Sequence, residues 1–174
     1  MKKIFMLTAM FICATVSLRS FAQDDKSKRP SPLTKVTQPI KGGAIISIEY
    51  SQPSVKGRTI GKDLEPMENK VWRTGANEAT VFETDKDITI DGKKLRKGKY
   101  GMFTLFNGNE CTVIFNSTWN QWGAFNYKEA DDVLRIKATV TNASTPTEVM
   151  TFKIDRSGQI TLLWGNLQVS FNVK

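Results

Sequence analysis

The feature that most constrains the fold is a pair of apolar segments, residues 99–106 and 109–116, joined at the dipeptide Asn107-Gly108. Asn-Gly between two such segments is a strong hairpin signal, because both turn positions then take positive φ. A two-residue loop at this dipeptide sets Tyr100 opposite Phe115. Both faces of the segments are apolar, so we expect the hairpin at the centre of a sheet that is covered on both sides.

Further short segments alternate between apolar and polar residues, as half-buried strands do. Beyond residue 22 we find no convincing amphipathic helix. The pattern predicts an all-β protein, an antiparallel β-sandwich of jelly-roll-like type with eight or nine strands. The clearest additional strands are residues 44–50, 133–141, 148–155, 159–164 and 167–174.

The N-terminus has the layout of a cleaved secretory signal. Lys2-Lys3 precedes a mostly apolar stretch over residues 4–18, and the small residues Ser20 and Ala22 stand where a signal peptidase reads the chain. This stretch is shorter than the roughly 20 residues that a membrane-spanning helix needs. We therefore expect residues 1–22 to be a signal peptide, the mature chain to lack a transmembrane segment, and the protein to be periplasmic or secreted.

Residues 23–35 are charged and interrupted by proline, and they contain too little apolar surface to order themselves. This composition predicts that residues 23–35 form a flexible leader before a β-sandwich domain over residues 36–174. Three basic residues and no acidic residue lie in the predicted signal, so its removal lowers the net charge from +8 to +5. The remaining positive charge is spread along the chain, and we expect no nucleic-acid partner.

The chain contains no histidine. This excludes Ser-His-Asp and Cys-His nucleophile systems, histidine-ligated zinc and histidine proton shuttles. Cleavage of the signal leaves Cys111 as the only cysteine, so we expect no intrachain disulfide. Its place in the central hairpin predicts a buried and inert thiol. We expect neither a metal site nor a cofactor.

Two segments carry the residues best suited to a ligand site. Residues 71–80, Val-Trp-Arg-Thr-Gly-Ala-Asn-Glu-Ala-Thr, place polar groups and an indole around a glycine, and residues 117–132 form a long aromatic-rich connection. Aromatic faces bind sugars and other flat ligands, while polar side chains fix their orientation. We expect a site where the segments meet, at one end of the sandwich, formed by Trp72, Arg73, Asn77, Glu78, Trp119, Trp122 and Tyr127.

Two other interpretations of these residues remain open. In the first, Trp72 belongs to the core, and Arg73 and Glu78 form a buried ion pair without any ligand. In the second, Glu78 and either Asp131 or Asp132 form the acid and base of a carboxylate-based hydrolase, which needs two carboxylates roughly 5–10 Å apart.

Residues 50–58, 71–80, 95–100 and 112–116 resemble an uncharacterised family of secreted bacterial proteins, domain of unknown function 2911. The resemblance covers roughly residues 31–155, and Trp-Arg-Thr-Gly-Ala-Asn-Glu is its most specific part. It implies a signal peptide and a β-rich body but no reaction. The function we expect is a non-enzymatic ligand-binding or accessory module, with a glycan as one candidate ligand. The alternatives are a carboxylate-based hydrolase and an envelope interaction protein without a small ligand.

Overall fold

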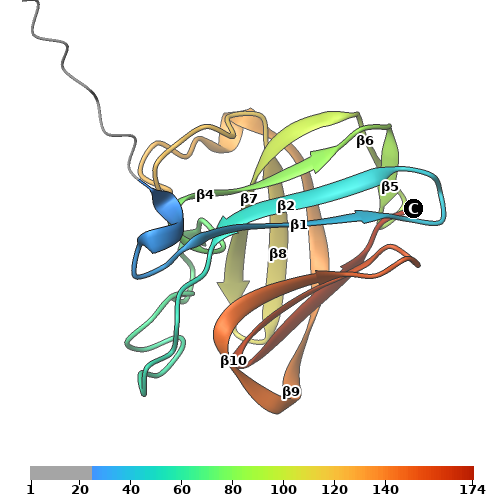
Figure 1. Ribbon diagram of the computed structural model, residues 1–174. Helices are drawn as coiled ribbons and strands as arrows, with labels where there is room; N and C mark the ends of the chain where they lie inside the picture. Colours follow the sequence, from blue (N-terminus) through green and yellow to red (C-terminus); the bar gives the residue numbers. More distant parts are fainter. Residues whose placement is uncertain (1–24) are drawn as a thin grey trace, which may run out of the picture.

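The computed structural model describes residues 25–174, and the predicted signal peptide lies outside this range. One antiparallel sheet of eight strands curls into a half-barrel, and a two-stranded hairpin lies beside it (Figure 1). The strands of the curled sheet are β1 (Leu33–Pro39), β2 (Ile45–Ser51), β3 (Val71–Trp72), β4 (Ala76–Thr84), β7 (Gly98–Asn107), β8 (Glu110–Asn116), β9 (Asp132–Ile154) and β10 (Gln159–Asn172). The hairpin consists of β5 (Ile88–Ile90) and β6 (Lys93–Leu95), and two short 3-10 helices are η1 (Lys26–Lys28) and η2 (Glu129–Asp131).

The prediction of an all-β, antiparallel protein is confirmed, but the strands do not form the two facing sheets of a sandwich. They follow the order β1-β2-β4-β7-β8-β9-β10 within one sheet, and β3 pairs with β7 beside β4. The reason is β9, which continues through the region that the sequence predicts as a break between two strands. Its first part pairs with β8, and most of its length pairs with β10. Register shifts around Gly165 place extra β9 residues opposite β10, and such bulges bend a strand.

The end of β9 folds back over the open side of the half-barrel. The Met150 amide donates to the Pro53 carbonyl at 2.9 Å, and the Val55 amide donates to the Glu148 carbonyl at 2.9 Å. Inside the molecule, the Phe152 amide donates to the Tyr50 hydroxyl at 2.9 Å. The chain that follows β2 and the end of β9 therefore close one side of the barrel without a second sheet.

The central hairpin is present, although its register differs from the prediction by two residues. Asn107 pairs with Glu110, and Met102, not Tyr100, lies opposite Phe115. Gly108 begins the turn with φ 56°, so the turn consists of Gly108 and Asn109 instead of Asn107 and Gly108. A shift of two keeps every side chain on its predicted face.

Both faces of this hairpin are covered, as predicted. The inner face carries residues of the large core, among them Met102, Phe115 and the fully buried Cys111. On the outer face, Phe103 and Ile114 form a small cluster with Ala79, against which Ala124 and Tyr127 pack. The aromatic loop, which we define as residues 117–131, therefore covers the sheet from outside.

The predicted flexible leader, residues 23–35, contributes to the fold in its described part. η1 and the start of β1 lie within it, and β1 pairs with β2 from Leu33↔Ser51 to Pro39↔Ile45. An edge strand needs only one partner and one partly buried face, which β1 supplies with Thr34, Val36 and Gln38. Within residues 25–174, no helix is long and apolar enough to cross a membrane.

Candidate functional site

The two segments in which the sequence places the site lie side by side. The Ala79 amide donates to the Gln121 carbonyl, and the Gly123 amide donates to the Asn77 carbonyl, both at 3.0 Å. These bonds flank a bridge between Glu78 and Trp122 and add the aromatic loop to β4 as a short extra strand. Figure 1 shows the loop, in light orange, next to the blue η1.

A glycine of β7 lets the aromatic loop approach the sheet. A Cβ on Gly101 would lie 3.1 Å from the Thr118 carbonyl oxygen and 3.4 Å from Cα of Trp119. It would also lie 2.9 Å from the Phe103 ring, closer than real side chains come. The start of the loop therefore rests directly on the β7 backbone.

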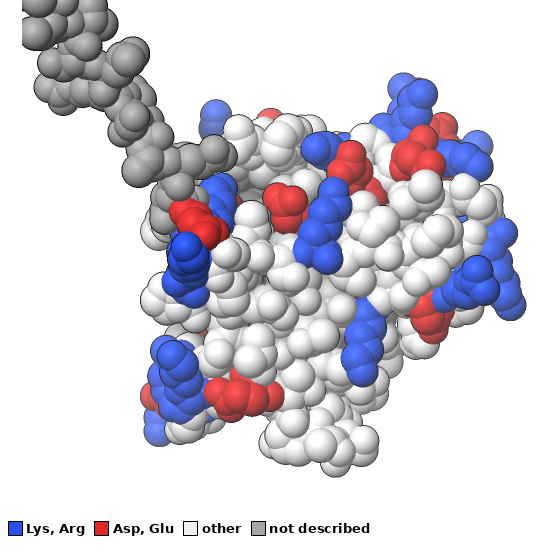
Figure 2. Space-filling model, viewed as in Figure 1, with Lys and Arg blue, Asp and Glu red and all other residues white. Residues whose placement is uncertain are grey.

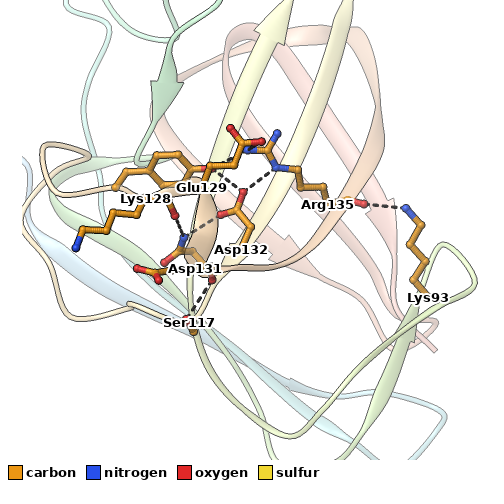
Figure 3. Close-up of polar contacts among 9 residues, drawn as sticks. Lys93, Ser117, Lys128, Glu129, Asp131, Asp132 and Arg135 are labelled. Atoms are coloured by element: carbon orange, nitrogen blue, oxygen red, sulfur yellow. Dashed lines mark hydrogen bonds and ion pairs between the residues drawn. The ribbon is translucent and has the colours of Figure 1, made fainter.

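The other end of the loop is held by a polar network around Asp132, whose side chain is only 8% exposed (Figure 3). Asp132 Oδ2 accepts from the Tyr127 hydroxyl at 2.6 Å and from Arg135 Nε at 2.7 Å. Asp132 Oδ1 accepts from Asn116 Nδ2 at 2.8 Å. Burial, together with the hydrogen bond to Asp132, raises the pKa of Tyr127 to about 12. Tyr127 thus anchors the loop and is not free to contact a ligand through its hydroxyl.

Glu78 pairs with the N-terminal segment and not with Arg73. Lys26 Nζ lies 2.8 Å from Glu78 Oε1, and Arg29 Nη1 donates to the two carboxylate oxygens at 3.0 and 3.1 Å. Burial alone would raise the pKa of Glu78, but the hydrogen bonds from Lys26 and Arg29 and the charge of Lys26 lower it to about 2. Glu78 is therefore ionised at neutral pH.

Asn77 holds the same N-terminal segment. Its backbone has φ 58°, a conformation that asparagine tolerates better than most residues. Its Nδ2 donates to the Ser31 carbonyl at 3.1 Å. Asn77 and Glu78 together bind the segment that leads into β1. The sequence motif alone does not indicate that this segment is their partner.

Trp72 lies in the core and is excluded from the candidate site. It is 2% exposed, its ring stacks on Trp164 at 5.8 Å, and its indole nitrogen donates to the Gly75 carbonyl at 3.1 Å. Arg73 is half-buried and lies beside Gly123 of the aromatic loop. A Cβ added to Gly123 would lie 3.5 Å from Nη1 of Arg73. Burial lowers its pKa, and the charge of Glu65 partly opposes this effect.

Trp119 and Trp122 are the exposed tryptophans, with 38% and 53% of their surface accessible. Each has a cation near one ring: Lys99 Nζ lies 5.2 Å from the Trp119 centroid, and Arg29 Cζ lies 6.0 Å from that of Trp122. Phe125 of the same loop is 81% exposed. The loop therefore presents aromatic surface to solvent at the place where the sequence predicts a site.

A pocket of about 70 Å³ opens below Trp119, between the aromatic loop, β2, β4 and the N-terminal segment. Two polar side chains in its wall, Ser51 and Gln121, are 1% and 9% exposed, yet Ser51 Oγ and Gln121 Oε1 have no hydrogen-bond partner. Buried polar atoms without a partner are rare in native proteins. The wall includes Lys26, Glu49, Ser51, Glu78, Trp119 and Gln121.

Several of these wall residues are absent from the site that the sequence predicts. Glu49 and Ser51 lie at alternate positions of β2, a spacing that puts them on one face, but nothing in the sequence shows that this face meets the aromatic loop. Lys26 lies in the segment predicted as a flexible leader. Only the tertiary structure brings these groups together.

The carboxylates near the site are mostly engaged. Asp131 Oδ2 accepts from the Thr118 hydroxyl at 3.1 Å, and both oxygens of Asp132 accept hydrogen bonds. Glu49 and Glu78 are the two carboxylates that line the pocket. Among residues 25–174, no group of three or more potential histidine, cysteine or acidic ligands is arranged to hold a metal ion.

A larger and more open groove of about 510 Å³ lies elsewhere, between the chain after β2 and the bend of β9 and β10. Its wall includes Arg58, Ile60, Asn142 and Leu167. Two of the Arg58 guanidinium nitrogens donate to the Val55 and Ser54 carbonyls, at 3.1 and 2.8 Å. This groove holds none of the residues that the sequence predicts for a site.

Comparison with known proteins identifies a family but no activity. No curated protein and no solved structure significantly matches the chain. One family model, described as a protein of unknown function (DUF2911), matches residues 31–173 and so includes the whole curled sheet. The chain therefore belongs to the DUF2911 family, as its Trp-Arg-Thr-Gly-Ala-Asn-Glu motif predicts.

Proposed function

We propose that this protein is a non-enzymatic ligand-binding or accessory module, and that its ligand enters the pocket below Trp119. The observation that carries the proposal is the exposed indole of Trp119 beside the buried, unpartnered acceptors of Ser51 and Gln121. An aromatic face next to fixed polar groups suits sugars and other flat polar ligands. A glycan is the ligand class we favour.

The state of the carboxylates supports binding over hydrolysis. A general acid must be protonated near neutral pH, and such groups have raised pKa values. The pKa of Glu78 is instead lowered to about 2 by its cationic partners. Asp132 is held by Asn116, Tyr127 and Arg135. A hydrolase remains the alternative through Glu49 and Glu78, because both line the pocket.

A different observation favours the second alternative, an interaction protein of the envelope. Trp122 and Phe125 are 53% and 81% exposed in one loop, and aromatic residues are enriched in the cores of protein interfaces.

Basic and acidic residues are interspersed on the face seen in Figure 2, which supports our expectation that nucleic acid is not the partner. The periplasmic or secreted location is part of the proposal, and N-terminal sequencing of the exported protein should begin at Gln23.

A binding screen with oligosaccharides and metabolites tests the proposal. We expect a ligand that binds the wild-type protein and loses most of its affinity in Trp119→Ala. The matched control is Ile45→Ala, which removes a 43% exposed apolar side chain that is not in the pocket wall. Equal binding by both variants would place the ligand elsewhere, and release of shorter sugars from the oligosaccharides would identify a hydrolase.

A further inference from the structure

We infer that the pocket below Trp119 is specific for a primary ammonium group, so that the ligand is an amine, such as an amino sugar. This inference rests on the proposed function and names the chemical class of its ligand. It is carried by three features of the pocket: acceptors in its wall, an ammonium of the chain itself in the same wall, and its size.

The wall of the pocket contains several hydrogen-bond acceptors, of which Gln121 Oε1 has no donor. Glu49 and Glu78 are carboxylates, which only accept when ionised. Gln121 uses its Nε2 to donate to the Thr118 carbonyl at 2.6 Å, which leaves Oε1 without a partner. The Ser51 hydroxyl, which can both donate and accept, is also unpartnered, and both side chains are at least nine-tenths buried. An ammonium group supplies three donors, which suit the two carboxylates and the free acceptor of Gln121.

The chain places an ammonium of its own at this position. Lys26 lines the pocket, and its Nζ lies 2.8 Å from Glu78 Oε1. Its side chain is 45% exposed and belongs to a 3-10 helix of only three residues, so little structure fixes it there. Arg29 Nη1 contacts both oxygens of Glu78, at 3.0 and 3.1 Å, and keeps the carboxylate oriented without Lys26. Exchange of Lys26 for a ligand ammonium also leaves the local charge unchanged.

The size of the pocket decides which part of a ligand enters. Its volume of about 70 Å³ is small beside the 510 Å³ of the groove at the bend of β9 and β10. We expect an ammonium with its carbon to enter this small space before a whole sugar ring does. The ring of an amino sugar would remain at the mouth, against the Trp119 indole. Lys99 Nζ, 5.2 Å from the centroid, shows that this indole already attracts a cation.

Calorimetric titration with three trisaccharides of equal length separates the inference from the proposed function. The probes are a β-1,4-linked glucosamine trimer, its N-acetylated counterpart and cellotriose. We expect the glucosamine trimer to bind at least about tenfold more tightly than the two neutral sugars, because only it brings charge-assisted donors. Equal binding of all three overturns the ammonium inference and leaves a glycan-binding function intact. Binding of none at millimolar concentration counts against both.

Two lysine variants test whether Lys26 occupies the place of the ligand. Lys26→Met removes the competing ammonium and should tighten binding of the glucosamine trimer severalfold, with no gain for cellotriose. Lys28→Met, in the same helix but 83% exposed and paired with Asp25, should leave binding unchanged. Weaker binding in Lys26→Met would make Lys26 part of the binding surface and overturn its role as competitor. Glu49→Gln should weaken binding of the glucosamine trimer alone.

Discussion

At the scale of single residues, the four tryptophans divide into two pairs with different roles. Trp72 and Trp164 stack in the core, whereas Trp119 and Trp122 lie on the surface. Trp72→Ala should therefore lower the free energy of unfolding by about 3–5 kcal/mol, because it removes a buried aromatic ring and leaves a cavity. Trp122→Ala should change it by less than about 1 kcal/mol. Urea denaturation of both variants measures this, and similar losses would show that the assignment of core and surface is wrong.

The ionised Glu78 side chain pairs with the N-terminal segment, so its titration makes the free energy of unfolding depend on pH. Its pKa is lowered in the folded protein, so its stabilising effect is fully present above its ordinary pKa of 4.5 and is lost as the pH falls through about 2. Since Glu78 and Lys26 are partly exposed, we expect Glu78→Gln to cost only about 1 kcal/mol at pH 7. The difference between wild type and variant, measured by denaturation at several pH values, should shrink below pH 4.5. A constant difference down to pH 2 would contradict the ion pairs.

At the scale of secondary-structure elements, the aromatic loop depends on the glycine beneath it. Gly101→Ala places a Cβ 2.9 Å from the Phe103 ring and 3.1 Å from the Thr118 carbonyl oxygen, and because Phe103 is fully buried we expect the start of the loop to shift away from β7. We expect the backbone amide signals of the loop to shift in NMR spectra and ligand affinity to fall. Gly42→Ala is the matched control, because its Cβ meets nothing closer than 3.8 Å. If Gly101→Ala behaves like Gly42→Ala, the loop is not positioned by this contact.

Also at this scale, the sequence predicts elements better than it predicts how they pair. The central hairpin, its two covered faces and the buried Cys111 follow from apolar residues on both faces and a turn dipeptide. The register differs because Gly108 takes the first turn position, a choice between neighbouring turns that the apolar pattern does not determine. The break predicted within β9 is absent because pairing with β10 continues through a polar stretch of the strand.

At the scale of the whole molecule, long-range contacts explain what the sequence does not predict. One curled sheet replaces the predicted sandwich because bulges in the pairing of β9 with β10 bend the sheet. The approach of the aromatic loop to residues 77–79 follows the expectation that the two segments meet. The partners of Glu78 were not predictable, because Lys26 and Arg29 lie about 50 residues away in a segment whose composition indicates a flexible leader.

The most direct test of the ligand site follows the four tryptophan indole signals in ¹⁵N-HSQC spectra during titration with the glucosamine trimer and cellotriose. Trp72 and Trp164 serve as internal controls, because both are buried in the core. We predict that at least one of the two sugars shifts the indole signal of Trp119, and to a smaller degree that of Trp122, while the signals of Trp72 and Trp164 stay in place. Shifts confined to the buried pair, or no shift at saturating sugar, would contradict a ligand site below the aromatic loop.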